Sequence, residues 1–421
     1  LDSSGNWYVT GYTYANGWVS GGWNTSLNGG SGSTSYADGF VVKLSSAGVH
    51  VWSSYLGRTN DDRGYGVAVD GSGNCFVTGY TNSSGWVSGG YQTTLAGNYD
   101  GFAVKLSSTG AHLWSSYLGG SMSEYAFGIA VDTLGNCYVA GSTESSGWVS
   151  GGWDTVLNDG DILTGDGFAV KMSGGGAYLW ASYLGGVGED CAYGVAVDAN
   201  GNCYVTGDTE SSGWVNGGWD TAVNNGSAGK LDGFAVKLSS AGAHVWSSYL
   251  GGAEDDSGQG IAVDTTGKCY MTGYTSSNGW VSGGWNTSFN GGNDDPFYRD
   301  GFVVTVLDTA TGSLQVTLTP ADAISANAQW RLAGSPVWHN SGDVIAGLAI
   351  GQWSIELKDV YGFAPPAPSA ATVLADETAE FTGAYTSVLV DMSWSSYLGG
   401  SGFDVGADIA VDINGNCYVA G

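Results

Sequence analysis

The chain has 421 residues, of which 74 are Gly and only 6 are Pro, together with 18 Trp, 24 Tyr and 12 Phe. The glycines follow no three-residue period, which excludes a collagen-type helix, and the abundant aromatic residues exclude a disordered chain. Because 39 Asp and Glu outnumber 11 Lys and Arg, the formal net charge is −28, which excludes nucleic acid and anionic membrane surfaces as partners.

One phrase, V-D-x-x-G-N-C-[YF]-V-[TA]-G, repeats along the chain. Copies stand at Val69–Gly79, Val131–Gly141, Val197–Gly207 and Val411–Gly421, with a variant at Val263–Gly273 and a first copy at Leu1–Gly11 that has Trp7 in place of Cys. The copies follow one another about every 66 residues, except before the last, where about 82 extra residues intervene. Such a period predicts a repeat architecture with one insertion.

Each period predicts four short strands, here called a, b, c and d in chain order. They are of the types Gly128–Asp132 (a), Cys137–Gly141 (b), Asp100–Lys105 (c) and Trp114–Gly119 (d). The a–b connection, D-x-x-G-N, predicts a tight hairpin, because Asp bonds the turn backbone and Gly supplies the positive φ. Four antiparallel strands at this period predict a β-propeller blade, whose middle strands are apolar because neighbouring blades cover both faces.

The b–c connection carries the repeated phrase G-W-V-[SN]-G-G-[WY]-[NDQ]-T. Two aromatic residues among Gly, Ser, Asn and Asp form a surface on which sugars can stack, while amides and carboxylates bond the hydroxyls. The alternative is that the aromatic residues pack the loop against its own or the next blade, since Trp is mostly buried in proteins. Both interpretations stay open for Trp18, Trp23, Trp86, Tyr91, Trp148, Trp153, Trp214, Trp219, Trp280 and Trp285.

The repeated core G-I-A-V-D-x-x-G-N-x-Y-V-T-G resembles the bacterial β-propeller repeat family often called the seven-bladed β-propeller repeat. The resemblance covers about 340 residues, which is nearly all of the chain outside the insertion. It implies an all-β propeller and a secreted or surface-exposed bacterial protein, and it supplies no catalytic residues.

Five blades are visible, with blades 1–5 in residues 1–308 and blade 5 interrupted. Residues 391–421 then supply the last strand of blade 5 and a further pair of strands a and b. In one interpretation strand a closes a five-bladed ring with the first three strands of the chain. In the other, which the additional strand b favours, the chain is a fragment of a larger ring.

The insertion, residues 309–390, has a different composition and holds five of the six prolines. Strands are predicted at 313–318, 328–332, 352–357 and 378–385. The segment resembles the small β-sandwich modules of bacterial surface proteins. We expect a domain inserted at a loop, where insertions are tolerated, and a dedicated binding module is the alternative.

Cysteine and histidine recur at fixed blade positions. Cys75, Cys137, Cys203, Cys269 and Cys417 are equivalent, and neighbouring blades hold them too far apart for disulfides, so we predict reduced core thiols in an apolar slot that Trp7 also fills. Cys191 is predicted to be a free thiol, with pairing to Cys203 as the alternative. His50, His112 and His244 share one position with Tyr178, which predicts a structural role.

Acidic residues follow strand d in each blade, including Asp61 and Asp62, Glu124, Glu189 and Asp190, Glu254 to Asp256, and Asp404 and Asp408. They lack the D-x-D-x-D-G pattern of a calcium loop. We therefore expect solvated loop acids and no cofactor, with calcium as the open alternative.

No catalytic motif is present, so the sequence predicts a protein that is not an enzyme. A hydrolase or lyase would need carboxylates that break the repeat symmetry at the propeller axis. The sequence contains no run of 18 apolar residues, so no membrane span is predicted. We expect an extracellular or cell-surface scaffold or adhesion protein with protein or glycan partners; the alternative is a multivalent lectin using the paired loop aromatics, whose weak sites would gain avidity.

Overall fold

The computed structural model describes residues 1–28, 36–158, 165–224, 229–265, 267–290, 299–306, 311–349, 351–367, 369–374, 378–388, 408–411 and 416–420. The chain divides into two units, Leu1–Ala310 and Thr311–Gly421. None of the helices in the described residues is long and apolar enough to cross a membrane.

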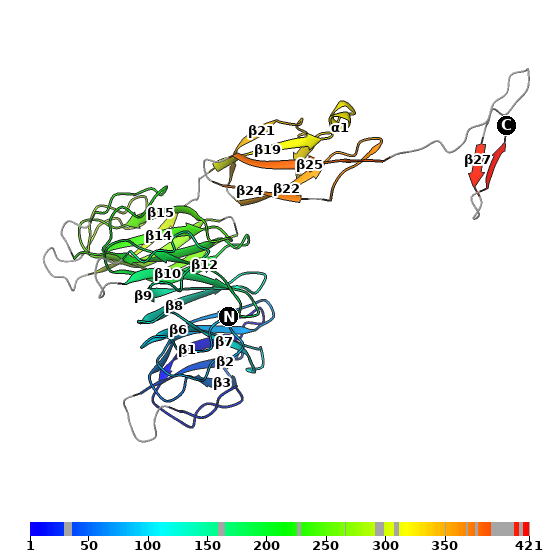
Figure 1. Cartoon of the computed structure of the whole chain (residues 1–421). Helices are drawn as coiled ribbons and strands as arrows, with labels where there is room; N and C mark the ends of the chain where they lie inside the picture. Colours follow the sequence, from blue (N-terminus) through cyan, green and yellow to red (C-terminus); the bar gives the residue numbers. More distant parts are fainter. Residues whose placement is uncertain are drawn as a thin grey trace, which may run out of the picture. The chain divides into compact units, whose positions relative to one another are not determined.

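The first unit consists of five antiparallel sheets stacked in chain order (Figure 1). Blade 1 holds β1 (Trp7–Thr13), β2 (Asp38–Leu44) and β3 (His50–Leu56); blade 2 holds β4 (Asp62–Val69), β5 (Cys75–Thr81), β6 (Asp100–Leu106) and β7 (His112–Leu118). Blade 3 holds β8 (Glu124–Val131), β9 (Cys137–Thr143), β10 (Asp166–Met172) and β11 (Tyr178–Leu184); blade 4 holds β12 (Asp190–Val197), β13 (Cys203–Thr209), β14 (Asp232–Leu238) and β15 (His244–Leu250). Blade 5 holds β16 (Asp256–Val263), β17 (Cys269–Thr275) and β18 (Asp300–Val306).

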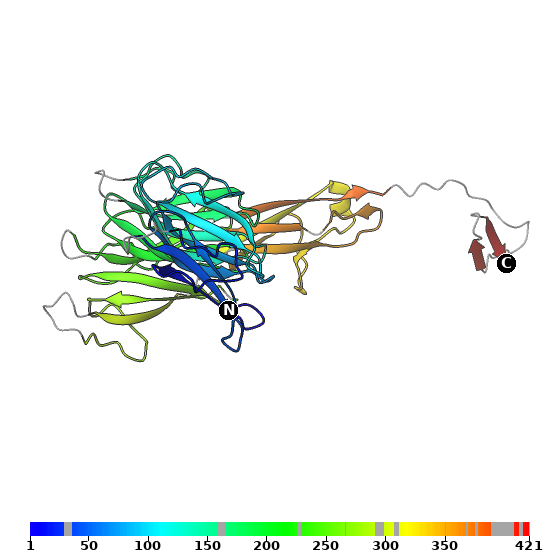
Figure 2. The ribbon, with the colours of Figure 1, turned by 90° about the horizontal axis from the view of Figure 1, so that it is seen from below.

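Blades 2, 3 and 4 run through strands a, b, c and d in order, so the predicted four-stranded antiparallel blade is confirmed there; in the described residues blade 1 holds strands b to d and blade 5 strands a to c. Seen from below, the strands of successive blades fan out (Figure 2). Strand a carries a bulge in blades 2 to 5. Beside this bulge successive a strands come close, because a Cβ on Gly128 would lie 2.6 Å from the main-chain oxygen of Tyr193 in the next blade. The fold is therefore an all-β propeller architecture.

Apolar side chains from adjacent blades form the core between them. Between blades 1 and 2, Trp52 packs with Cys75 and Phe102, and its indole nitrogen donates to the main-chain oxygen of Ser108 at 3.1 Å. The predicted apolar cysteine slot is thus confirmed for the four blades with a preceding neighbour. The prediction is wrong for Trp7, which is 53% exposed because no described blade covers that face of blade 1.

The D-x-x-G-N segments form the predicted hairpins. Oδ1 of Asp132 accepts from the backbone amides of Leu134 and Asn136, and Oδ2 accepts from the Asn136 amide and the Tyr138 hydroxyl. These aspartates are committed to the turn, as the repeated position predicts.

The b–c loop covers the outer edge strand of its own blade. Gly21 bridges Ser53 in parallel, and equivalent bridges join Gly89 to Ser115, Gly151 to Ala181 and Gly217 to Ser247. The Gly-Gly pair of the loop phrase serves this contact: Gly21 has a φ of 75°, and a Cβ on Gly22 would lie 2.3 Å from the main-chain oxygen of Ser53. Covering strand d in this way protects an edge that would otherwise template aggregation.

The second unit holds β19 (Thr311–Thr319), α1 (Ala321–Ser325), β20 (Trp330–Leu332), β21 (Val344–Ala349), β22 (Gly351–Leu357), β23 (Phe363–Ala364), β24 (Ser369–Val373), β25 (Thr378–Ala384), β26 (Thr386–Ser387), β27 (Asp408–Val411) and β28 (Cys417–Ala420). The sheets β21-β19-β25 and β20-β22-β24 share a core around Val316, Trp330 and Ile355. Strand β27 pairs with β28, as expected for strands a and b. The predicted last strand of blade 5, near 394–399, lies outside the described residues.

Candidate functional site

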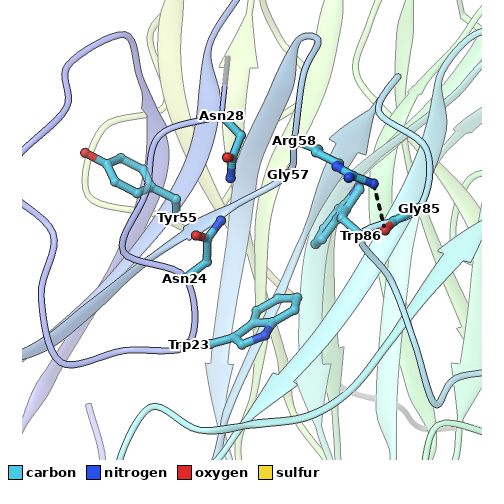
Figure 3. A pocket seen from close by; sticks show the side chains of 8 residues that line it. All are labelled: Trp23, Asn24, Asn28, Tyr55, Gly57, Arg58, Gly85 and Trp86. Atoms are coloured by element: carbon cyan, nitrogen blue, oxygen red, sulfur yellow. Dashed lines mark hydrogen bonds between the residues drawn. The ribbon is translucent and has the colours of Figure 1, made fainter. Parts of the chain in front are cut away.

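Two equivalent pockets lie between blades, where the b–c loops meet the d–a loops. The first has a volume of about 270 Å³ and lies between blades 1 and 2; it is lined by Trp23, Asn24, Asn28, Tyr55, Gly57, Arg58, Gly85 and Trp86 (Figure 3). The second has a volume of about 460 Å³ and lies between blades 3 and 4; it is lined by Trp153, Asp154, Asn158, Tyr183, Gly185, Gly186, Val187, Ser212, Gly213 and Trp214. Pockets for small molecules commonly span about 300–1,000 Å³, so each is of a size for one small ring.

Each pocket has one aromatic wall from each of two blades. Trp23 ends the blade 1 loop phrase, and Trp86 begins the phrase of blade 2; their ring centres are 6.2 Å apart. The corresponding pair, Trp153 and Trp214, is separated by 6.4 Å. The sequence grouped the two aromatics of one loop, whereas the structure groups aromatics of successive loops. A spacing within one repeat carries no signal for this arrangement.

The first aromatic of each loop is anchored by its own blade. The indole nitrogen of Trp86 donates to Thr81 Oγ1 at 3.1 Å, and the ring meets Phe102 edge to face at 5.2 Å. Trp148, Trp214 and Trp280 repeat both contacts in their blades. Trp18 differs, since it donates to the Ala15 carbonyl and is 39% exposed.

In blades 1, 2 and 3 the second aromatic of the loop reaches the next blade. Trp23 stacks on His112 with ring centres 4.2 Å apart, Trp153 lies 4.2 Å from His244, and Tyr91 lies 4.9 Å from Tyr178. Trp219 and Trp285 are 49% and 103% exposed, in blades 4 and 5, where strand d of the following blade is not among the described residues. Packing therefore accounts for much of the loop phrase, and a ligand-binding role for the ten aromatic residues stays a prediction.

Histidine at the start of strand d is structural in its contacts. Nε2 of His112 and of His244 shares a 2.9 Å hydrogen bond with the serine three residues later. Burial lowers the pKa of His244 to about 4, so this imidazole is neutral at physiological pH. The repeated position thus supports the Trp stack between blades.

Buried carboxylates lie at the start of strand a, and two of them, Asp62 and Asp190, bond the backbone of residues that line the pockets. Asp62 accepts from the backbone nitrogen of Arg58 at 2.7 Å and from Ser83 Oγ at 2.8 Å, and it also accepts from the Thr81 hydroxyl. The expectation of solvated acids is wrong here, because Asp62, Glu124, Asp190 and Asp256 are at most 1% exposed. Burial raises the pKa of the first three to about 7 and also raises the pKa of Asp256.

These carboxylates complete a hydrogen-bonded chain that begins at the first tryptophan of the b–c loop. In the third blade the Trp148 indole donates to Thr143 Oγ1, which donates to Glu124 at 2.9 Å, and the backbone nitrogen of Gly120 donates to the same side chain. The acids therefore hold the d–a loop and the first loop tryptophan in place. Across the described residues, no group of three or more His, Cys, Asp or Glu could hold a metal ion, and calcium stays a prediction.

Asp208 in blade 4 is a polar residue that departs from the repeat. Asp208 stands where other blades have Tyr or Ser, accepts from Ser257 Oγ at 2.8 Å, and is 4% exposed. Burial raises its pKa to about 6.

The five cysteines whose burial is described are free, which contradicts a pairing of Cys191 with Cys203. Burial raises the pKa of Cys191 to about 12, which makes it a poor nucleophile.

Five segments match the family model SBBP, whose description is beta-propeller repeat: residues 51–85, 113–147, 179–213, 245–279 and 393–421. The repeats of this chain are beta-propeller repeats. Each of the first four matches begins in strand d and stops one residue before the first loop tryptophan. The aromatic b–c loops and strand c therefore lie outside the matched propeller-repeat segments.

The chain is similar to two curated proteins over part of their length. It is 26% identical over 184 residues to an uncharacterized WD repeat-containing protein of Acanthamoeba polyphaga mimivirus, covering 37% of this chain and 13% of that protein. It is 25% identical over 286 residues to the regulatory protein FlaEY of Caulobacter vibrioides, covering 63% and 28%. A mutant of Synechocystis apocarotenoid oxygenase aligns over 91% of this chain and 93% of its own, with 9% identity and a TM-score of 0.26.

Proposed function

We propose that this chain is a non-catalytic interaction protein of the extracellular or cell-surface adhesion type, in a bacterium, whose partners bind the aromatic b–c loops. The propeller repeats and the similarity to a WD repeat-containing protein support an interaction scaffold. The low density of charge and the acidic surface suit a soluble exported protein.

The observation that carries the proposal is that the strands and the b–c loops of a blade differ in what their side chains contact. The strands and hairpins use their polar groups internally, whereas the b–c loops run along the outside and leave aromatic rings in solvent, as at Tyr91, which is 49% exposed although the blades on both sides of it are described. Aromatic residues are enriched where proteins bind partners. Equivalent loops from successive blades repeat this surface, which gives weak contacts the benefit of multivalency.

A second candidate, a multivalent glycan-binding protein, is favoured by the two equivalent pockets. Each combines ring faces with short polar side chains: Asn24 and Asn28 in the first pocket, and Asp154 and Asn158 in the second. Rings that stack on C–H faces and amides that bond hydroxyls are the chemistry of saccharide recognition. This candidate places the ligand between blades rather than on the exposed rings.

The test of the interaction function compares binding of the labelled chain to intact cells and matrix polymers. We expect Tyr91→Ser to weaken binding several-fold, because its ring is 49% exposed between two described blades. The matched control, Leu134→Ser with Val49→Ser, removes exposed apolar side chains from the hairpin turns and should bind as the parent does. Equal loss in both variants, or none in either, would contradict the loop surface.

The glycan candidate needs its own variant. Ser212 is exposed on the wall of the second pocket, so Ser212→Trp fills that pocket without removing a core side chain. A glycan array, run with and without calcium, should lose signal with this variant if saccharides bind there. Alanine at Trp86 is a poor probe because its ring is buried against Phe102. Protease shaving of cells that produce the protein tests the surface location.

A further inference from the structure

The pocket between blades 1 and 2 differs from the one between blades 3 and 4 in the charge of its wall. Position 58, just after strand d, is Arg in the first pocket, whereas the equivalent residues of the next three blades are Gly120, Gly186 and Gly252. On the opposite wall the second pocket carries the charged residue: Asp154 stands there where the first pocket has the neutral Asn24. The two pockets share aromatic walls but carry opposite charges.

Arg58 is not explained by the packing of the propeller. It is solvent-exposed, and its Nη1 donates to the main-chain oxygen of Gly85 at 3.4 Å, a long contact (Figure 3). No described carboxylate lies within salt-bridge distance of its guanidinium, whereas Arg63 pairs with Asp61 at 2.9 Å. In a chain with only 11 basic residues and a net charge of −28, this arginine keeps its donors available on a pocket wall.

The two asparagines across this pocket offer a ligand one donor and one acceptor. Figure 3 shows Asn24 and Asn28 on one side and Arg58 with Trp86 on the other. The amide oxygen of Asn24 accepts from the backbone nitrogen of Ser26 at 3.1 Å, which leaves the amide nitrogen for a ligand. The buried Asp62 beneath is occupied by donors from Arg58, Ser83 and Thr81. Arg58 and the Asn24 amide therefore offer donors to an anionic group next to an apolar ring face. The Asn28 amide nitrogen donates to the Ser26 carbonyl at 3.0 Å, which leaves its oxygen to accept from a sugar hydroxyl.

We propose that the pocket between blades 1 and 2 binds a uronic acid residue, with its ring against the tryptophan wall and its carboxylate on Arg58. A planar guanidinium matches a carboxylate with two parallel hydrogen bonds. The pocket between blades 3 and 4, with Asp154 and no arginine, takes a neutral sugar. This inference rests on the glycan-binding candidate above and assigns its two sites to different sugars.

Arg58→Gly is a sharp probe because it installs the residue that three other blades already have at this position. The measurement is calorimetric titration of the whole chain with methyl glucuronide, with methyl glucoside as the neutral counterpart and acetate as the carboxylate without a ring. We expect one glucuronide site per chain, no binding of acetate, and a loss of roughly tenfold or more in affinity in Arg58→Gly, since hydrogen bonds to charged groups contribute about 1.5–3 kcal/mol. Arg58→Lys keeps the charge without the fork and should be intermediate.

The outcomes separate this inference from the function on which it rests. Arg331→Gln removes one positive charge in the second unit and should leave the glucuronide affinity unchanged. Equal glucuronide affinity of the parent and Arg58→Gly, or acetate binding as tight as glucuronide, overturns the inference. Glucoside binding to both pockets without a preference for glucuronide overturns it while the glycan function stands. Absence of binding by every sugar, with cell binding retained, overturns it and leaves the interaction function in place.

Discussion

The buried carboxylate of Asp190 gives a stability prediction with an unusual sign. One oxygen accepts from the backbone nitrogen of Gly186 at 2.9 Å and from Ser211 Oγ at 2.7 Å, and the carboxylate also accepts from the Thr209 hydroxyl. Burial raises the pKa from 3.8 to about 7, and the nearby Asp208 acts in the same direction. The folded protein therefore retains this proton in a range where the unfolded chain has lost it.

The sign follows from proton linkage. Between about pH 4 and pH 7 the Asp190 carboxyl binds more protons in the folded state than in the unfolded state. Its contribution to the free energy of unfolding therefore falls as pH rises and levels off above pH 7. A shift of about three units corresponds to about 4 kcal/mol, at about 1.4 kcal/mol per unit. Asp190→Asn resembles the protonated acid at every pH, and we expect its stability relative to the parent to improve by up to about 4 kcal/mol between pH 4 and pH 8.

Urea unfolding monitored by tryptophan fluorescence at pH 4.5, 6 and 8 measures this difference. The equivalent acids of the other blades titrate in both proteins, so the comparison isolates Asp190. Glu189→Gln is the matched control, because Glu189 is the neighbouring residue and is exposed; its curve should run parallel to that of the parent. A parallel curve for Asp190→Asn as well would refute the assignment of a raised pKa to this carboxylate.

Three further changes test the packing of the blades. Gly152→Ala places a Cβ 2.3 Å from a main-chain oxygen of strand d, and we expect urea unfolding to show a loss of about 1–3 kcal/mol in the free energy of unfolding. Gly175→Ala is the control and should be near neutral, because the nearest atom to its Cβ would be 3.9 Å away. Trp180→Ala removes a side chain that is 3% exposed and bonded to the next blade at 3.1 Å; thermal unfolding should show a loss of about 3–5 kcal/mol. Cys203 is fully buried, so mass spectrometry after iodoacetamide treatment should find it unmodified in the native protein and alkylated in urea.

The blade architecture is the part of the fold that the sequence predicts well, because it depends on local patterns. The D-x-x-G-N turn and the apolar strands on each side of it specify a hairpin within a few residues, and Asp132 forms the turn that its position predicts. Repetition then predicts neighbours that bury both faces of the middle strands. The same logic fails for Trp7, since burial of that position depends on a preceding blade, and none is described.

The pockets could not be predicted in the same way, because their walls come from different repeats. Trp23 meets Trp86 only through the stacking of two blades, and their pairing depends on how the blade 1 loop follows strand d and reaches its neighbour. The burial of Asp62 and Glu124 was missed for a related reason. Acidic residues in a Gly-rich loop are typical of solvated turns, whereas here they accept hydrogen bonds from a Ser or Thr in strand b or just after it.

Packing and binding explain different residues of the same loop. The Gly-Gly pair and the first tryptophan recur because strand d must be covered and the ring must fill the space beside strand c, and any repeat of this kind has to satisfy both. A property imposed on every blade cannot distinguish one ligand from another. Specificity must therefore reside where the blades differ around a pocket of shared shape, and the differences at residue 58 and at the Asn24 position change its charge while leaving the aromatic walls in place. For that reason the residues that depart from the repeat, rather than the tryptophans that define it, are the ones to vary when the ligand is sought.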